Sequence, residues 1–396
     1  MSKRLEAQVW SLDNCSGCGM CVATCSKQVL RWNGEQHPYL EKRTKTVGMT
    51  RTPLDTCSIC EKFCEEGCPR LEGRRLSPLE VKAYLAARSL GPVKSGAPND
   101  VIRSILTAGR SAGLLDGVVT LDLDPWELKP VARLAFTVEE IVDSVGPQYL
   151  WAPVLDALNE AIFERGMENI AVVGPPCVAQ AIRQLKASTN PRLRPYQDAI
   201  RLSIAFFCTG IYRPEMIDEL IVKRLGIPVE RVRRMEISPD REWLRVVLWD
   251  GSERTIPRQA AESFTRSGCA SCDDFLGDSA DLSVGMTGAL EDYTTLILRT
   301  RPADVFVRNA VHMHLLEATQ SVNVEALQAA AQQKERRQRA QEFESMRLLA
   351  LDALEDPLKH SEAIQQFVRL YRTPIRTRSP YADKSLQVTR GGCGGC

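Results

Sequence analysis

Two runs of closely spaced cysteines near the amino terminus have residue types and spacings that suit iron–sulfur chemistry. The gaps within each run are two or three residues long, and the runs hold eight of the 14 cysteines: Cys15, Cys18, Cys21, Cys25, Cys57, Cys60, Cys64 and Cys68. This is the ferredoxin pattern for [4Fe–4S] clusters, in which the fourth cysteine of a run ligates the other cluster. Ser26 stands where proline usually closes such a run, and the second run has one extra residue, but neither change removes a ligand.

The repetition of the runs predicts how the eight thiolates are shared. Cys68 joins the first three cysteines, and Cys25 joins Cys57, Cys60 and Cys64, as in a pseudo-symmetric two-cluster fold. The alternative is a pair of zinc knuckles. Zinc sites usually pair two C-x2-C units across a longer gap, so the compact quartets favour iron–sulfur clusters.

Four more cysteines are dispersed over the middle of the chain: Cys177, Cys208, Cys269 and Cys272. The first two directly follow the predicted strands NIAVVG and RLSIAFF, at the edge where open α/β sheets build their sites. The other two form a C-x2-C pair before the predicted strand DLSVG. A four-thiolate site from three segments is one interpretation. The other is that Cys177 and Cys208 are buried apolar thiols, and the spacing alone favours neither.

Composition limits the class of protein. The chain has 396 residues, with 51 basic and 50 acidic side chains, so nothing in its net charge indicates nucleic acid or a membrane surface. No apolar run approaches the roughly 18 residues of a transmembrane helix, and the start MSKRLEAQVWSLDN has no secretory h-region. Clustered cysteines in such a chain indicate metal ligands in a reducing cytoplasm rather than a disulfide framework.

Beyond the cysteine runs, predicted helices and strands alternate. We expect an α+β fold, with an α/β domain and a mixed sheet over residues 76–318. A ferredoxin-like domain with two [4Fe–4S] clusters precedes it at residues 1–75, and a helical extension with a flexible tail follows at residues 319–396.

Several local signals support this division. Asn99 or Asp100 can cap a helix through VIRSILTAG, and Thr137 with Glu140 forms a capping box. The stretch VLDALNEAIFERG predicts a longer helix, and RVRRMEI and WLRVVLW predict a hairpin pair.

The middle of the chain resembles the beta subunits of the coenzyme F420-reducing hydrogenase and F420 dehydrogenase family. The resemblance covers roughly residues 75–315 and rests on VVGPPC, FFCTG, CASCDDFLGDSADLSVG and YTTLILRT, in that order. It implies an FAD domain that acts on F420 and holds a third [4Fe–4S] cluster on the four dispersed cysteines. The N-terminal module resembles the form seen in the F420 dehydrogenase members. The resemblance also implies cofactor contacts at Gly96, Asn99, Arg103, Gly174, Pro175, Pro176, Arg299 and Thr300.

The stretch SGAPNDVIRS departs from the family pattern. Asn99 and Asp100 stand where glycines are expected, and Arg103 stands near a hydroxyl position. Backbone N–H groups at a helix start would still face a phosphate, with Arg103 pairing with it and Asp100 opposing it. A basic group that suits the phosphate and glutamate tail of F420 follows the GPPC turn, although a solvated helix face explains it equally well: Arg183, Lys186, Arg192 and Arg194.

The predicted function is electron transfer. A hydride donor delivers two electrons at once and a cluster accepts one, so a flavin is needed between them. We therefore expect a subunit that passes electrons between F420 and a partner complex through FAD and three clusters. The sequence leaves four kinds of partner complex open: hydrogenase, formate dehydrogenase, heterodisulfide reductase and membrane dehydrogenase. We expect the chain itself neither to insert into a membrane nor to bind nucleic acid. The alternatives are a reductase of another organic substrate and an electron-wire subunit without flavin.

Two further patterns have ordinary interpretations. His312 and His314 are spaced as metal ligands, but unremarkable histidines in a helix or strand are the preferred interpretation. Cys393 and Cys396 fit a mobile redox dithiol or a metal clip, and a chain end without a role is the preferred alternative.

Overall fold

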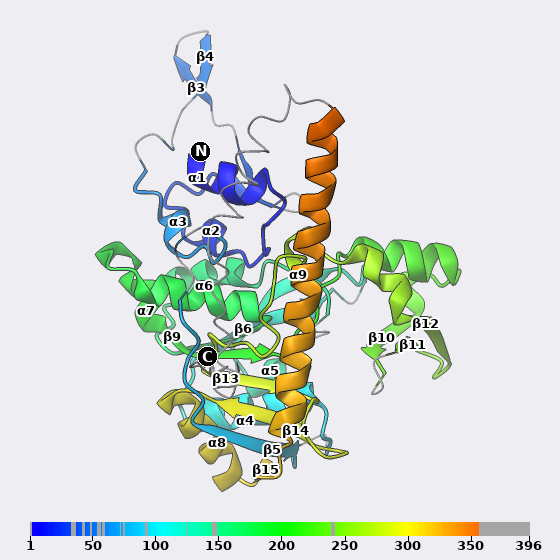
Figure 1. The fold of residues 1–396 in the computed structure, drawn as a ribbon. Helices are drawn as coiled ribbons and strands as arrows, with labels where there is room; N and C mark the ends of the chain where they lie inside the picture. The colour runs from blue at the N-terminus through cyan, green and yellow to red at the C-terminus, as the bar shows by residue number, and fades with distance from the viewer. Residues whose placement is uncertain are drawn as a thin grey trace, which may run out of the picture. The chain divides into compact units, whose positions relative to one another are not determined.

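An eight-stranded mixed sheet organises the larger part of the protein (Figure 1). Its strand order is β15-β5-β14-β13-β9-β8-β6-β7. The strands are β5 (Ala83–Ser89), β6 (Gly117–Leu123), β7 (Pro130–Ala135), β8 (Ile170–Gly174), β9 (Ile200–Phe206), β13 (Leu282–Gly285), β14 (Thr294–Leu298) and β15 (Leu316–Thr319). Strands β6, β8, β9 and β13 are parallel neighbours, and the remaining strands pair antiparallel. The predicted mixed sheet with helices is confirmed.

The computed structural model describes residues 2–32, 37–41, 44–47, 50–53, 57, 60–71, 73, 76–91, 94–124, 126–144, 149–238 and 242–355. Met1–Gln338 form one compact unit and Arg339–Cys396 a second. The proposed domain boundaries at residues 75 and 318 remain predictions.

Helices pack on both faces of the sheet, and alternating residues of each strand contribute to the two cores. On one face, Val118 and Val173 pack with α4 (Pro98–Ser111) and α8 (Arg301–His312). On the other face, Val119 and Val172 pack with α6 (Pro176–Ala187) and α7 (Arg194–Ala199). The two faces follow from the period-2 alternation of side chains along a strand. The sheet is therefore covered on both sides, which leaves its strand ends for chemistry.

Helix α4 is confirmed, but its predicted cap is wrong. The expected apolar face, Val101, Ile102, Ile105 and Leu106, is fully buried. The cap residue is Ala97, with no side-chain cap bond, and the helix begins two or three residues earlier than expected because Pro98 suits its first position. The capping box is confirmed before α5 (Val138–Ser144), where Thr137 Oγ1 accepts from Glu140 N at 3.1 Å.

The helix expected through VLDALNEAIFERG is confirmed as one continuous helical stretch over residues 154–164, which opens with a 3-10 turn (Val154–Ala157) and closes with a π-helical turn (Glu160–Glu164). This helical stretch contacts the cysteine-rich region. Leu155 N donates to Cys18 O at 3.1 Å, and Asn159 Nδ2 donates to Ala23 O at 2.9 Å. These bonds fix the segment against the first cysteine run.

The cysteine-rich region is built from short elements, and its ferredoxin-like fold remains a prediction. The elements are α1 (Lys3–Leu5), a π-helical turn (Glu6–Trp10), α2 (Met20–Ala23), β1 (Leu30–Arg31), β2 (Tyr39–Leu40), β3 (Thr44–Val47), β4 (Thr50–Pro53) and α3 (Phe63–Glu66). Buried Met20 and Ala23 of α2 and Phe63 of α3 belong to the core that packs on α6.

A separate three-stranded sheet confirms the predicted hairpin. It consists of β10 (Val232–Ile237), β11 (Trp243–Leu248) and β12 (Glu253–Pro257), in that order and antiparallel throughout. Further short helices connect the strands: Pro191–Leu193, Ile217–Arg224, Val229–Arg231, Arg258–Phe264 and Ser267–Cys269.

The last described element is helix α9 (Val324–Glu355), which agrees with the predicted helical stretch. No helix among the described residues is long and apolar enough to span a membrane. His312 ends α8, and His314 follows it with a φ of 56°. Cys393 and Cys396 lie outside the described residues.

Candidate metal and cofactor site

The cysteines of the two N-terminal runs lie in two groups of four. Burial, together with Cys15, Cys18 and Cys68, raises the pKa of the Cys21 thiol well above its usual value. Burial likewise raises the pKa of Cys64 to about 12, and the interacting thiols there are those of a different set: Cys25, Cys60 and Cys57. We call these sets the first quartet (Cys15, Cys18, Cys21 and Cys68) and the second quartet (Cys25, Cys57, Cys60 and Cys64). The crossed grouping is the one that the repeat predicts, and ligation itself remains a prediction.

The two quartets differ in their exposure to solvent. All members of the first quartet are buried, whereas all members of the second are half-buried. The second quartet lines one surface pocket together with Trp10, Lys27 and Lys62. Cys60 Sγ also accepts a hydrogen bond from Lys62 N at 3.3 Å. Of the two quartets, the second is therefore the one that meets the surface.

Parallel pairing of β8 and β9 brings two distant cysteines to one edge of the sheet. Cys177 is the second residue of α6, just beyond the end of β8, and Cys208 follows β9. Cys208 N donates to Phe275 O at 3.0 Å, which ties this edge to the loop that carries Cys269 and Cys272. Besides burial, Cys272 and Cys208 help to raise the pKa of Cys177. These four cysteines form the third quartet, assembled from the three segments that the sequence indicated.

The quartets lie in series. Cys177 of the third quartet interacts electrostatically with Cys18 of the first, and its Sγ lies 3.9 Å from Ser16 O. Cys21 of the first quartet in turn interacts with Cys64 of the second. The order is therefore third, first, second, from the sheet edge to the surface.

Two cations beside the third quartet were not predicted from the sequence. Lys334 of α9 is 8% exposed, and its Nζ donates to Cys208 O and to Asp274 O, both at 2.7 Å. Arg70 donates through Nη2 to Gly268 O at 3.2 Å. Burial raises the pKa of Cys272, but Lys334 and Arg70 outweigh burial and bring that pKa below its usual value. Arg70 follows the ligand-like Cys68 by two residues, which was the one available signal. No sequence signal distinguishes Lys334 from the other charged residues of its helix.

A buried arginine–tryptophan pair joins the first quartet to the sheet. Arg266 is 2% exposed, and its guanidinium carbon lies 4.3 Å from the Trp151 ring centroid. Trp151 Nε1 donates to Gly17 O at 2.9 Å, within the first cysteine run. A Cβ on Gly268 would lie 2.2 Å from Cys15 O, so the loop of the third quartet touches the first run directly. Sequence reasoning missed these residues because they are adjacent only in the fold.

The spacing of the cysteines bears on the choice between zinc and clusters. Within the described parts of the chain, no three His, Cys, Asp or Glu side chains converge as ligands of one metal ion do. A zinc ion draws each thiolate to about 2.3 Å. A [4Fe–4S] cluster is held by four thiolates on separate iron atoms, which lie farther apart. The preference for clusters over zinc rests on the compact spacing of the two cysteine runs in the sequence.

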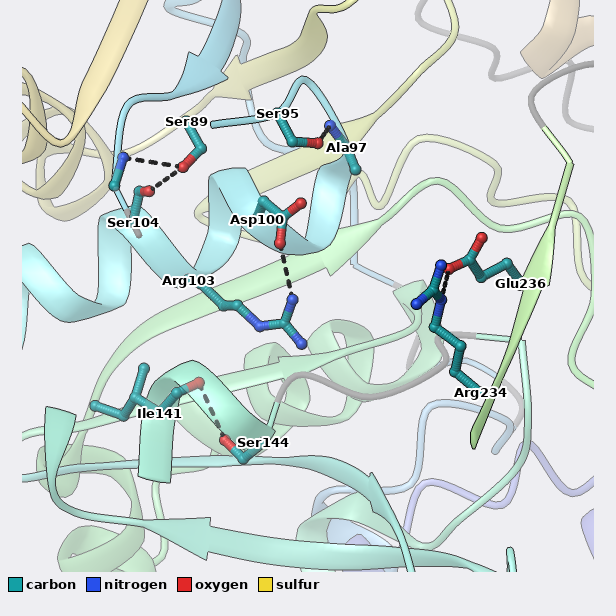
Figure 2. A network of polar contacts seen from close by, with 11 residues as sticks. Ser89, Ser95, Ala97, Asp100, Arg103, Ser104, Ile141, Ser144, Arg234 and Glu236 are labelled. Carbon is teal, nitrogen blue, oxygen red and sulfur yellow. Dashed lines mark hydrogen bonds and ion pairs between the residues drawn. The ribbon is translucent and has the colours of Figure 1, made fainter. Parts of the chain in front are cut away.

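The start of α4 is already occupied by internal hydrogen bonds (Figure 2). Gly96 N donates to Asp292 Oδ1 at 3.1 Å, and Ala97 N donates to Ser95 Oγ at 2.9 Å. Asp100 N donates to Ala97 O, and Pro98 has no N–H group. Arg103 Nη1 donates to Asp100 Oδ1 at 2.8 Å, as Figure 2 shows. As arranged, these residues do not fit a phosphate.

The other predicted cofactor residues lie in two places. Gly174 and Pro175 line a narrow pocket with Cys18, Cys177 and Trp151, beside the third quartet, and Pro176 starts α6.

Arg299 is buried elsewhere, and donates to Ser283 Oγ at 2.6 Å and to Leu276 O at 3.3 Å. Thr300 Oγ1 donates to Asp281 Oδ1 at 2.7 Å. Internal contacts thus account for Arg299 and Thr300.

The four predicted basic residues do not form one patch. Lys186 Nζ donates to Ile200 O at 2.7 Å, and Arg192 pairs with Glu61 at 2.7 Å. Arg183 interacts electrostatically with Arg299 and Asp278, and its Nη1 is buried without a partner among the described residues. Among the described residues these contacts therefore do not bring the four basic side chains together as one anion site.

Comparisons with known proteins identify relatives of this chain among beta subunits of coenzyme F420 hydrogenases. The family model for the C terminus of the coenzyme F420 hydrogenase/dehydrogenase beta subunit matches residues 167–324. An uncharacterized protein of Methanocaldococcus jannaschii is 32% identical over 85% of this chain and 97% of its own length. The coenzyme F420 hydrogenase subunit beta of Methanothermobacter thermautotrophicus is 27% identical over 55% of this chain and 76% of its own length.

One solved structure shares the fold. It is a chain of the F420-reducing [NiFe] hydrogenase complex from Methanosarcina barkeri, with a TM-score of 0.58 and 21% identity. The match covers 67% of the present chain and 91% of that chain.

Proposed function

The chain belongs to the coenzyme F420 hydrogenase/dehydrogenase beta-subunit family, and from this premise we propose that it is an F420-linked electron-transfer subunit. Electrons pass between F420 and a partner complex through three [4Fe–4S] clusters, in a direction set by the partner. One observation carries the proposal: three cysteine quartets lie in series from a sheet edge to the surface.

The donor chemistry of the quartets fits iron–sulfur clusters. Each quartet supplies the four thiolates of one [4Fe–4S] cluster. Bound there, clusters would supply one-electron transfer, and the chain holds the quartets close together and shields the first, whose four thiols are all buried, from water. The half-buried second quartet is the natural point of exchange with a partner.

Hydride chemistry needs a group that accepts two electrons and releases them singly, which a flavin does. Gly174, Pro175 and Pro176, next to Cys177, are the residues that we propose for its redox end. The occupied start of α4 does not fit a phosphate as arranged, so we assign no flavin contact to Gly96, Asn99 or Arg103 in this arrangement.

The experiment is F420-dependent reduction of a viologen dye by the anaerobically purified chain. We expect dye reduction that requires reduced F420 and added or bound FAD. Cys272→Ala should abolish it, because the third quartet is the one at the sheet edge. Dye reduction that persists in this variant, or that fails in the fully loaded wild type, would contradict the proposal.

A second candidate is an electron-wire subunit without flavin. The internal hydrogen bonds at the start of α4 favour it, since they remove donors that would otherwise hold a phosphate. The two candidates differ in one measurable quantity, the FAD bound per chain after purification with FAD present.

We also propose a partner complex and a cellular location for the chain. Beta-subunit relatives belong to F420-reducing hydrogenases, and we propose a comparable redox complex as the partner, in the cytoplasm. Formate dehydrogenase, heterodisulfide reductase and membrane dehydrogenase complexes are the alternatives, to be distinguished by co-purification.

A further inference from the structure

We propose that Arg70 and Lys334 raise the reduction potential of the cluster on Cys177, Cys208, Cys269 and Cys272 by holding two positive charges against it. The inference rests on the proposed function, since it requires that cluster. It adds two residues from outside the quartet, one from the cysteine-rich region and one from helix α9.

Lys334 is held in place by the loop that surrounds the quartet. Its Nζ donates to Cys208 O and to Asp274 O, both at 2.7 Å. An ammonium group has three N–H donors, so one remains without a partner among the described residues. The side chain is buried, with 8% of the residue exposed. Asp274 is itself fixed, because Gln180 Nε2 donates to its Oδ2 at 2.7 Å.

Arg70 contacts the third quartet from the N-terminal cysteine-rich region, whereas Lys334 contacts it from helix α9. Its Nη2 donates to Gly268 O at 3.2 Å and its Nη1 to Ser271 O at 3.5 Å, on either side of Cys269. Its Nε is buried and has no hydrogen-bond partner among the described residues. These contacts place the guanidinium along the C-x2-C loop, with a donor left over for a sulfur atom.

Side chains of both charges lie near the second quartet. Glu65 acts on Cys64, whereas Lys27 and Lys62 line the pocket of this quartet. Neither Arg70 nor Lys334 is among the described residues that line that pocket. Glu65 also accepts from Ser2 Oγ at 2.5 Å and pairs with Arg4 at 3.6 Å, which holds its side chain near the quartet. The second quartet therefore serves as an internal reference for the third.

The physical basis is electrostatic. Reduction adds one electron to the cluster and neither forms nor breaks a bond, so a nearby positive charge stabilises the reduced state. Net charge, hydrogen bonds to sulfur and exclusion of solvent all set cluster potentials. Charges in a region with little water interact more strongly than the same charges in bulk water.

The test is a redox titration of the loaded full chain, followed by electron paramagnetic resonance (EPR). The signal of the third cluster is assigned by its loss in Cys269→Ala. We expect Lys334→Met and Arg70→Gln each to make reduction of this cluster about tenfold less favourable, which is about 59 mV for one electron. The potential of the second cluster should not change.

Matched variants separate charge from structure. Lys334→Arg and Arg70→Lys keep the charge and should keep the potential near that of the wild type. Lys186→Met removes a lysine whose Nζ likewise donates to a backbone carbonyl, that of Ile200 at 2.7 Å, and should have no effect.

The outcomes are distinct. An unchanged potential in both charge-removing variants overturns the inference, and so does loss of the third cluster from both, which would make the cations structural. A wild-type chain with only two clusters by iron content and EPR overturns the three-cluster function itself. Three clusters with unshifted potentials would leave that function standing.

Discussion

Cys25 closes the first run in the sequence but lies beside the second run in the structure. We predict that Cys25→Ala destroys the cluster of Cys57, Cys60 and Cys64 and leaves the cluster of the first quartet intact. One cluster's content of iron should be lost, and the remaining EPR signal should be that of the buried cluster.

Cys68→Ala is the matched control, because Cys68 makes the reciprocal crossing. It should remove the buried cluster and spare the half-buried one. Loss of the first-run cluster in Cys25→Ala would show that each run binds its own cluster.

Asp156 is a half-buried carboxyl group next to the first cysteine run. Burial raises the pKa of Asp156 to about 6, although Arg31 partly opposes this. Because the folded-state pKa lies above the unfolded value, its stabilising effect is complete below about pH 4 and is lost as pH rises to about 6. The loss amounts to at most about 3 kcal/mol.

We therefore predict that Asp156→Asn gains thermal stability relative to the wild type between pH 4 and pH 6, and that the difference levels off above. The measurement is Tm by circular dichroism under argon at several pH values. Asp143→Asn, at an exposed position of α5, should show no such trend. A difference in Tm between Asp156→Asn and the wild type that is independent of pH would contradict the assignment.

Helix α4 is the element where the family pattern and this chain diverge. Asp100 accepts from Arg103 at 2.8 Å and places a negative charge in the first turn of the helix. A phosphate at this helix start would be repelled by Asp100 and deprived of Arg103. We predict that Asp100→Asn tightens FAD binding about fivefold, which corresponds to about 1 kcal/mol.

The measurement is titration of FAD fluorescence with the apo-flavin chain. Asp143→Asn is again the control for removal of one acidic charge. Equal or weaker binding in Asp100→Asn would exclude a phosphate site at this helix start.

The loop that carries Cys269 and Cys272 lies against the first cysteine run with no space for a side chain. A Cβ on Gly268 would lie 2.2 Å from Cys15 O, a backbone atom that cannot move aside alone. We predict that Gly268→Ala lowers stability by about 1–3 kcal/mol through overpacking and slows electron transfer between the third and first clusters.

Chemical denaturation and cluster-reduction kinetics test this prediction. Gly210→Ala is the control, since its Cβ would meet a Thr265 methyl group at 3.2 Å, which can shift. Equal stability of the Gly268 and Gly210 variants would contradict the close approach.

The sequence predicted correctly those features that depend on short residue spacings or on the periodicity of apolar residues. The buried face of α4, the hairpin of β10 and β11, and the cysteines at the ends of β8 and β9 all follow from local signals. The predicted cap of α4 was wrong because Pro98 suits the first position of the helix, and the preceding Gly96 is held by a long-range hydrogen bond to Asp292.

Strands β5, β7 and β15 were not predicted, although they form much of the antiparallel part of the sheet. The cations of the site were likewise invisible. Arg70 and Lys334 are far apart in the sequence, and both lie beside the third quartet only because the fold brings their segments to it. No periodic pattern encodes such a contact.

At the scale of the whole molecule, residues Met1–Gln338 form a single compact unit in which the cysteine-rich region lies against the sheet. Leu155, Asn159 and Trp151 all hydrogen-bond to the first cysteine run. Electron relays depend on short distances between centres, so this close packing is consistent with a fixed relay between the sheet edge and the surface.

The most direct test is an anaerobic absorption titration of the fully loaded chain with reduced F420. We expect that any bound flavin bleaches and that the broad cluster absorbance then falls, until two electrons per F420 are recovered on the clusters. Clusters that stay oxidised while F420 remains reduced, with FAD present, would contradict F420-linked electron transfer by this chain.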